Sequence, residues 1–187
     1  MGASVTVRDA VPAGDSEACA AIYAPYVRDS YSTFELAAPG AAEMAARISI
    51  AAESYAWLVA EVDGAVVGYA YGGPHATRAA YRWACSVSVF VAAQLQGVGI
   101  GAALYEALLE RLKSLGYLTA TAGITIPNAA SVALHERFGF REVARYARIG
   151  YKLGKWHDVI WMQRDFLPEG ADFPVPPHEP GRPRAGT

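Results

Sequence analysis

The sequence predicts an α/β fold in which helices flank one mixed, mostly antiparallel sheet. An apolar, β-branched run over 87–91 leads into a glycine-rich turn over 96–102 and then an amphipathic helix over 103–115. A second pattern, over 57–71, has a strand on each side of the Asp-Gly pair at 63–64, which favours a type I′ hairpin turn.

The other elements follow from local signals along the chain. Pro127 ends a strand, Asn128 starts a short helix and Gly139 closes that helix. The full pattern predicts a strand over 5–9, a helix capped by Asp15 or Ser16 that runs to about Val27, an aromatic loop over 30–35, a helix over 41–52, strands over 83–91 and 118–126, a helix over 129–138, and a last strand pair over 141–149 and 156–166. The order βααβββαβαββ favours a mixed sheet over a doubly wound one.

Composition and charge restrict the class of protein. The 187 residues suffice for one domain, which we expect over 1–167, followed by a proline-rich tail over 168–187 that is disordered or strapped onto a neighbouring subunit. A net charge of −2 without a basic stripe argues against nucleic acid as a partner, and no apolar run is long enough to span a membrane. Cys19 and Cys85 form no disulfide or metal pattern, so we expect buried thiols in a reducing cytoplasm.

The glycine-rich turn over 96–102 predicts an anion site, because unpaired amides and the helix dipole attract a phosphate at a helix N-terminus. A P-loop needs a Lys and a Ser or Thr after the last glycine, whereas two alanines follow here. The dinucleotide fingerprint G-x-G-x-x-G/A is met by letters, but the strand over 118–126 lacks the acidic residue that it requires. A third motif, Q/R-x-x-G-x-G/A, is filled by Gln96, Gly99 and Gly101, and a turn that binds nothing is the alternative.

Through this third motif the sequence resembles the GNAT superfamily of acyl-CoA-dependent N-acyltransferases, and over 5–166 it looks like the phosphinothricin N-acetyltransferase branch. The segments that carry the match are 57–61, Ala80, Tyr81, Trp83, 96–101, Asn128, Ser131, 134–136, 139–140, 150–152, 156–159 and 163–166. The resemblance implies a GNAT-type fold, acetyl-CoA as co-substrate without a metal, and a homodimer. It implies as acceptor a small-molecule amine, namely an amino acid or an amino-acid-like compound such as phosphinothricin or methionine sulfoximine.

The resemblance also implies where acetyl-CoA lies. The backbone of Val89 and Val91 would hydrogen-bond the pantetheine arm, and Asn128 would contact the cofactor near the thioester. Plain core valines and a helix N-cap are the structural alternatives. The cofactor-binding residues that the resemblance implies are Val89, Phe90, Val91, Gly97, Val98, Gly99, Ile100, Gly101, Ala102, Asn128 and Ser131.

Three residues are candidates for catalysis by the same resemblance. His135 stands where these enzymes place a group near the thiolate leaving group, and histidine titrates near neutral pH; a structural histidine is the alternative. The usual general base of the family is a glutamate on the central strand, and this chain has Ser86 there, which cannot take a proton at neutral pH. Glu35 on the aromatic loop is the candidate substitute base.

The same resemblance implies that the loop over 73–83 and the loop before the second helix recognise the substrate. Arg78 would clamp a carboxylate or phosphinate with its planar fork, Tyr81 would add a hydroxyl and Phe34 would form a wall. An exposed loop charge is the alternative for Arg78.

The remaining histidines are assigned no chemistry. His157 is expected to be structural, and His75 and His178 have no constellation around them. The sequence thus predicts an acetyl-CoA-dependent N-acetyltransferase acting on a small amine, with a different amine, such as a peptide terminus, as the alternative acceptor. The alternative is an acyl-CoA-binding module with weak or lost catalysis, because Ser86 replaces the usual glutamate.

Overall fold

The computed structural model describes residues 5–168, 170–173 and 180–181. Its elements in chain order are β1 (Val5–Asp9), α1 (Pro12–Asp29), α2 (Ala41–Ser54), β2 (Trp57–Val62), β3 (Ala65–Pro74), the 3-10 turn η1 (Ala79–Tyr81), β4 (Ala84–Val91), the 3-10 turn η2 (Ala93–Leu95), α3 (Ile100–Ser114), β5 (Thr119–Ile126), α4 (Ala129–Arg137), β6 (Arg141–Lys152) and β7 (Lys155–Asp165). Apart from the two 3-10 turns, this is the predicted order of strands and helices.

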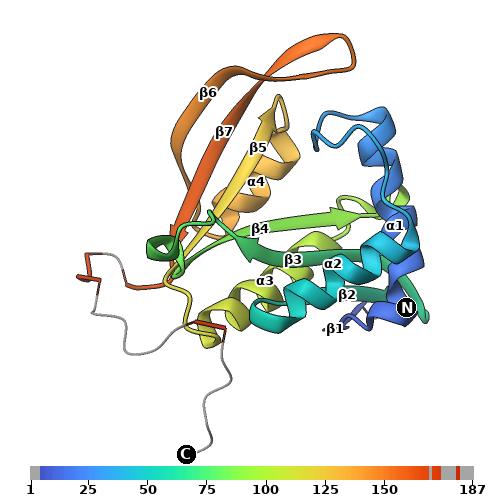
Figure 1. Cartoon of the computed structure of the whole chain (residues 1–187), viewed down its shortest axis with the longest axis horizontal. Helices are drawn as coiled ribbons and strands as arrows, with labels where there is room; N and C mark the ends of the chain where they lie inside the picture. The colour runs from blue at the N-terminus through green and yellow to red at the C-terminus, as the bar shows by residue number, and fades with distance from the viewer. Residues whose placement is uncertain (1–4, 169, 174–179, 182–187) are drawn as a thin grey trace, which may run out of the picture.

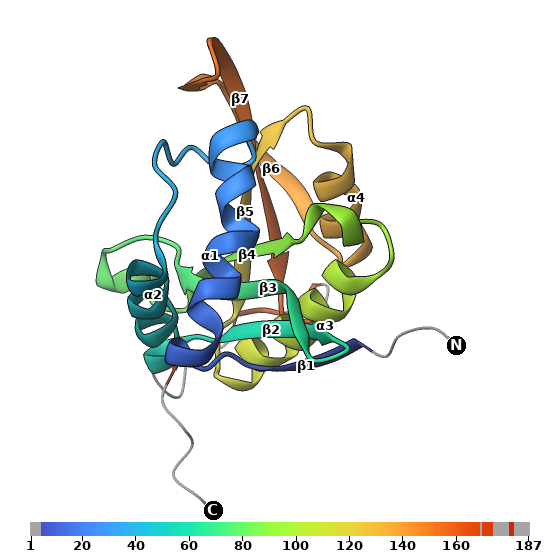
Figure 2. The same cartoon turned by 90° about the vertical axis from the view of Figure 1, so that its right-hand side faces the viewer.

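One seven-stranded sheet in the order β1-β2-β3-β4-β5-β7-β6 forms the centre of the described chain. Among its neighbouring strands, β4 and β5 pair in parallel and the other pairs are antiparallel. Helices α1 and α2 cover one face of the sheet, and α3 and α4 cover the other (Figures 1 and 2). The predicted mixed, mostly antiparallel sheet flanked by helices is confirmed.

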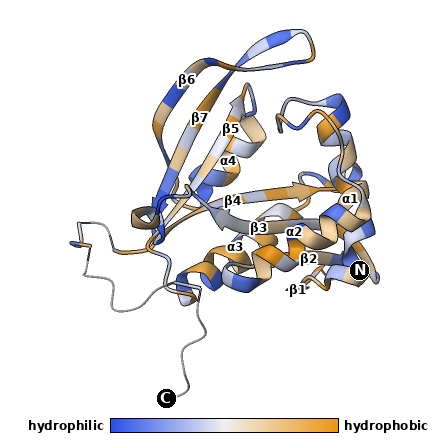
Figure 3. Ribbon diagram, in the orientation of Figure 1, coloured by the Kyte–Doolittle hydropathy of each residue, from blue (hydrophilic) through white to orange (hydrophobic). Residues whose placement is uncertain are grey.

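Each face of the sheet has its own apolar core, because successive strand residues point to opposite faces. Leu104 and Leu108 of α3 share one core with Val87 of β4. Tyr69 of β3 and Phe90 of β4 belong to the other core, beneath α1 and α2, with their ring centroids 5.4 Å apart. In Figure 3 the hydrophobic colour runs along β4. Strand β4 is therefore held on both faces, and this fixes its backbone in place.

Strands β4 and β5 part after a short stretch of pairing. Residues 84–86 pair with residues 119–121, and beyond this point the two strands diverge (Figure 1). Strand β5 stays paired with β7 along its whole length. The backbone of 87–91 therefore has no ladder partner on the side of β5.

Helix α1 begins at Pro12, earlier than the predicted caps Asp15 and Ser16. Proline suits the first turn of a helix because its fixed φ fits and its missing N–H would have no partner there. The Asp15 carboxylate instead reaches back and accepts a hydrogen bond from the backbone N–H of Val11 at 2.6 Å. The predicted cap thus stabilises the helix start from inside the first turn.

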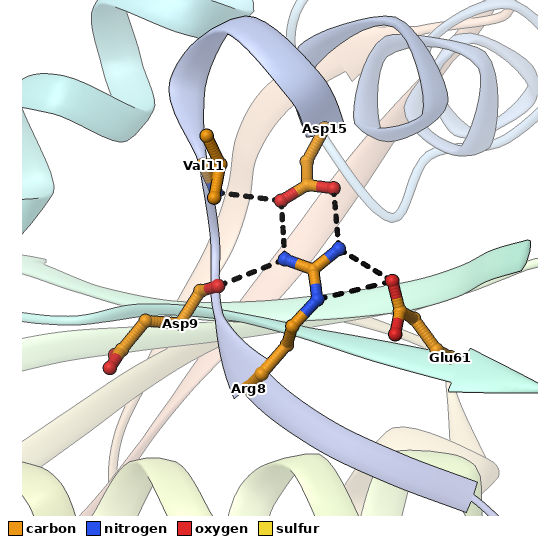
Figure 4. Close-up of polar contacts among 5 residues, drawn as sticks. All are labelled: Arg8, Asp9, Val11, Asp15 and Glu61. Atoms are coloured by element: carbon orange, nitrogen blue, oxygen red, sulfur yellow. Dashed lines mark hydrogen bonds and ion pairs between the residues drawn. The ribbon is translucent and has the colours of Figure 1, made fainter. Parts of the chain in front are cut away.

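A charged network connects β1, α1 and β2 (Figure 4). The Arg8 guanidinium donates to both oxygens of Asp15, at 2.7 and 2.8 Å, and also to Glu61 and to the backbone carbonyl of Asp9. The Asp15 side chain is only 5% exposed, whereas that of Arg8 is 35% exposed. The hydrogen bonds from Arg8, more than any other contact, lower the pKa of Asp15.

Two hairpins turn on pairs of residues with positive φ. Asp63 and Gly64, with φ of 50° and 80°, form the β2–β3 turn, as predicted. Leu153 and Gly154, with φ of 51° and 75°, form the β6–β7 turn. Because the chain reverses at these two residues, β6 continues to Lys152, beyond its predicted end.

Most of the predicted tail over 168–187 lies outside the described residues. Two described tail residues contact the body of the chain: Gly181 N donates to Leu115 O at 3.0 Å, and Pro180 lies against Gly116. Within the described ranges, no helix is long and apolar enough to cross a membrane.

Candidate active site

A cleft of about 550 Å³ opens where β4 and β5 part. The predicted cofactor residues that line it are Val89, Phe90, Val91, Gly97, Gly99, Gly101, Ala102, Asn128 and Ser131. The side chains of the other two lie elsewhere, since Ile100 is buried in the core against α3 and Val98 is 66% exposed. Nine predicted residues from three separate segments, 89–91, 97–102 and 128–131, thus meet at one cavity.

The backbone of Val89 and Val91 faces this cleft. Ala92 N donates across to β3 at 2.8 Å, and along an antiparallel strand alternate residues bond to opposite sides. Val89 and Val91 therefore turn their backbone groups toward the unpaired side. Tyr26 occupies part of this edge, because its hydroxyl donates to Val91 O at 2.6 Å and accepts from Gln96 Nε2 at 2.7 Å. A ligand that pairs with Val91 must therefore take the place of the tyrosine hydroxyl.

Six consecutive backbone amides, from Gly97 to Ala102, donate no hydrogen bond to another described residue. Gly97 and Gly99 have φ of 79° and 97°, which side-chain-bearing residues rarely adopt, and Gly99 is the N-cap of α3. The helix begins at Ile100, before its predicted start, so the last three free amides belong to its first turn. Together with the helix dipole, these unpaired amides are suited to bind an anion at one end of the cleft.

The first turn of α4 forms a further wall. Asn128 Oδ1 accepts from Ser131 N at 3.1 Å, so the side chain of Asn128 caps the helix, and this structural alternative is confirmed. Asn128 Nδ2 donates to no other described residue, and Asn128 lines the cleft. Arg137, at the other end of the same helix, also lines the cleft and adds a positive charge that was not predicted.

His135 is buried, with both ring nitrogens engaged. Its Nε2 lies 2.7 Å from Tyr105 Oη, and its Nδ1 lies 2.7 Å from the carbonyl oxygen of Ser131. A carbonyl only accepts, so Nδ1 carries the proton and Nε2 accepts from the tyrosine hydroxyl. Burial lowers the pKa of His135, although the backbone hydrogen bond acts in the opposite direction. The imidazole is therefore neutral and already satisfied.

Ser86 lies where the strands part, beside a threonine and a histidine. Its Oγ is 3.3 Å from Thr121 Oγ1, and His75 Nδ1 is 2.9 Å from the same threonine oxygen. The expectation that no constellation surrounds His75 is therefore wrong. Neither Thr121 nor His75 was predicted, because their meeting depends on the parallel register of β4 with β5, which is set through α3.

The carboxylate of Glu35 is occupied by protein partners, which does not suit a general base. Arg47 donates to both carboxylate oxygens, at 2.7 and 2.9 Å, and Tyr23 Oη donates to one of them at 3.0 Å. These hydrogen bonds, with Arg47 as the main cause, lower the pKa of Glu35 against the effect of its partial burial. The ionised carboxylate holds the aromatic loop to α1 and α2.

The aromatic loop also rests on the β6–β7 hairpin. A Cβ added at Gly150 would collide with the ring of Phe34, so only glycine lets that ring lie on β6. The buried Lys152 Nζ donates to the carbonyl oxygen of Thr33 at 2.7 Å. His157 Nε2 lies 3.0 Å from the carbonyl oxygen of Lys152, which fits the expected structural histidine. Phe34 thus packs on the hairpin and does not line the cleft.

Arg78 and Tyr81 lie outside the cleft as well. Arg78 is exposed at the start of η1, as the structural alternative expects. Tyr81 contacts His75, with ring centroids 5.6 Å apart. The structure therefore brings Tyr81 against His75, whose partner Thr121 also contacts Ser86, and leaves Arg78 exposed.

An unpaired strand edge that ends at a phosphate-binding helix start matches the shape of an acyl-CoA molecule, with its extended arm and its pyrophosphate. Fold and site together define an acyl-CoA-dependent acyltransferase. The chain belongs to the GNAT acetyltransferase family, because the family described as "Acetyltransferase (GNAT) domain" matches residues 10–161.

Its relatives are N-acetyltransferases. Phosphinothricin N-acetyltransferase of Streptomyces viridochromogenes is 43% identical over 131 residues, which cover 70% of this chain and 68% of the relative. An L-methionine sulfoximine/L-methionine sulfone acetyltransferase of Salmonella typhimurium is 37% identical over 109 residues, covering 58% of this chain and 64% of the relative. A crystal structure of a GNAT phosphinothricin acetyltransferase from Sinorhizobium meliloti with acetyl-CoA has a TM-score of 0.83 and 37% identity, covering 86% of this chain and 88% of the other. The chain is thus an N-acetyltransferase of this family.

Proposed function

We propose that the chain transfers the acetyl group of acetyl-CoA to the amine of an amino acid or an amino-acid-like compound of the phosphinothricin and methionine sulfoximine type. The observation that carries this proposal is the unpaired edge of β4 beside six free amides. The names of the relatives support the class of acceptor. The acetyl-CoA in the Sinorhizobium meliloti structure supports the donor.

The chain's own groups would bind the donor in three places. The amides of Gly97 to Ala102, with the dipole of α3, would bind the pyrophosphate, and Arg137 would add positive charge nearby. The backbone of Val89 and Val91 would pair with the pantetheine arm as a further strand does. Acetyl-CoA supplies an acetyl group that is already activated as a thioester. The chain must therefore hold an uncharged amine nitrogen against it.

We propose a structural role for His135, in place of a catalytic one. Replacing His135 with leucine should lower the free energy of unfolding by about 2–3 kcal/mol, because the buried hydroxyl of Tyr105 loses its hydrogen-bond partner. His135→Gln retains a hydrogen-bond donor and an acceptor, so it should lower the free energy of unfolding by a smaller amount. Urea unfolding of the three proteins gives the differences. A large fall in kcat for a fully stable His135→Gln variant would restore the catalytic role.

The proposed function is tested by release of free thiol from acetyl-CoA. Phosphinothricin and methionine sulfoximine should raise the release rate by at least about tenfold over hydrolysis without an amine. The 2-hydroxy acids that correspond to these acceptors lack the amine and should leave the rate at background. Tight acetyl-CoA binding without amine-dependent release from a wide panel of amines would instead identify the acyl-CoA-binding module.

We also propose a cytoplasmic homodimer. Exposed apolar and aromatic side chains gather on the β6–β7 hairpin, which projects from the body in Figure 1; they are Val143, Tyr146, Ile149, Tyr151, Leu153 and Trp156. A surface of this kind is typical of a protein interface, and equilibrium sedimentation of the intact chain tests it.

Cys19 and Cys85 are free and buried, with burial raising the pKa of each thiol to about 12. Free thiols of this kind suit the reducing cytoplasm that we propose.

A further inference from the structure

The proposed reaction needs a proton acceptor, because an amino-acid amine reaches the site largely as an ammonium ion. No aspartate or glutamate is among the described residues that line the cleft. Glu35 is held in its ionised form by Arg47, and His135 has both nitrogens engaged. The proton acceptor must therefore be sought beside the cleft, at the point where β4 and β5 part.

A polar cluster lies at this point. Thr121 Oγ1 donates its one proton to the carbonyl oxygen of Cys85 at 3.2 Å. His75 Nδ1, 2.9 Å from Thr121 Oγ1, must then be the donor in their hydrogen bond, and Ser86 Oγ, at 3.3 Å, donates to the same oxygen. This arrangement selects the tautomer of His75 that carries its proton on Nδ1. The other nitrogen, Nε2, keeps a free lone pair and has no described partner.

The surroundings of His75 place it next to the cleft. Its ring contacts the edges of Tyr81 and Trp161, with centroids 5.6 and 5.9 Å apart. Trp161 packs over Gly123, which itself lines the cleft. The imidazole is partly exposed, so a substrate or a water molecule can reach it.

We propose that His75 is the proton acceptor for the amine, and that Thr121 and Ser86 position it. The proposal rests on the proposed function. His75 Nε2 takes one proton from the ammonium group, which leaves a neutral amine. The amine nitrogen forms the bond to the acetyl carbon, the carbon–sulfur bond breaks, and its electron pair leaves with sulfur. The second amine proton neutralises the thiolate, and the imidazolium returns its proton to bulk water.

Histidine is suited to this task because its ordinary pKa lies closest to neutral pH among the side chains. The titratable group in contact with it is Tyr81. Arg78 and Arg82 are the charged residues of its loop. On β7, the charged residues within four positions of Trp161 are Asp158, Arg164 and Asp165. The pH profile of kcat/KM, compared between wild type and a His75 variant, therefore tests whether this imidazole takes the proton.

The test compares kcat/KM for the amine in wild type and His75→Asn. Asparagine retains a donor for Thr121 but has no basic nitrogen, so the variant keeps the local hydrogen bond. At pH 7 we expect a loss of about 10²–10³-fold, an unchanged Kd for acetyl-CoA, and a smaller loss at pH 9.5, where more of the amine is already neutral. In His75→Ala, added imidazole should restore part of the rate.

Two threonines on β5 allow a matched test of whether Thr121 positions His75. Thr121→Val removes the anchor of His75 and should lower kcat/KM by about tenfold. Thr119, two residues away, bonds to Asp165 instead, so Thr119→Val should stay within about twofold of wild type. An active wild type whose His75→Asn variant keeps its rate and pH profile, or whose His75→Ala variant gains nothing from imidazole, overturns the inference. Wild type inactive toward every amine would instead overturn the proposed function.

Discussion

Replacing Gly99 with valine is expected to raise the Kd for acetyl-CoA by about 100-fold, which corresponds to about 2.7 kcal/mol. Gly99 has a φ of 97° at the start of α3, a conformation in which a β-branched residue is a genuine outlier. The turn must rearrange to accept the new side chain, so the amides over 97–102 no longer face a common point. Titration calorimetry with acetyl-CoA measures the change.

Gly64 provides the control for this experiment. It has a φ of 80° in the β2–β3 turn, and a Cβ added at either glycine meets no atom within 4 Å. Gly64→Val and Gly99→Val should both lose about 1–3 kcal/mol of stability from backbone strain. Binding should fall only for Gly99→Val. Equal binding by wild type and Gly99→Val, or equal weakening by both variants, would mean that this turn does not hold the pyrophosphate.

The sequence predicted those parts of the molecule that local signals determine. The Asp-Gly turn at 63–64, the run over 87–91 and the glycine-rich turn before α3 each depend on a few neighbouring residues. The structure has all three, although α3 begins at Ile100 and so takes in the last three residues of the predicted turn. The N-cap at Asn128 belongs to the same group. Nine of the predicted cofactor residues line one cleft because they lie on or beside these elements.

Contacts between distant segments could not be predicted in this way. His75 meets Thr121 through a parallel register that the sequence does not encode locally. The sequence makes Glu35 a candidate base, whereas in the structure Arg47, twelve residues away, donates hydrogen bonds to both of its carboxylate oxygens. Side-chain chemistry at this site therefore depends on tertiary pairing, whereas the proposed binding of the cofactor depends on local backbone geometry.

Replacing Arg8 with methionine is expected to lower the free energy of unfolding by about 2–4 kcal/mol. The change leaves the Asp15 carboxylate, which is 5% exposed, without its cation. The expected loss is below that for a fully buried pair, because Arg8 itself is 35% exposed and partly screened. Arg111→Met is the matched control: it breaks a second arginine–aspartate pair, with Asp9, in which both side chains are well exposed. Arg111→Met should lower the free energy of unfolding by less than about 1 kcal/mol.

The pH dependence of the Arg8 effect separates lost charge pairing from lost packing. Asp15 has a lowered pKa in the folded chain, so its stabilising contribution is present above the ordinary aspartate value of about 3.9 and is lost as pH falls through the folded value. The difference between wild type and Arg8→Met should therefore shrink as pH falls and Asp15 becomes protonated, first in the variant, whose carboxylate has lost Arg8, and then in wild type. Asp15→Asn added to Arg8→Met removes the stranded charge and should recover part of the loss. A difference that does not change with pH, or a double variant no more stable than Arg8→Met, would assign the effect to packing of the arginine stem.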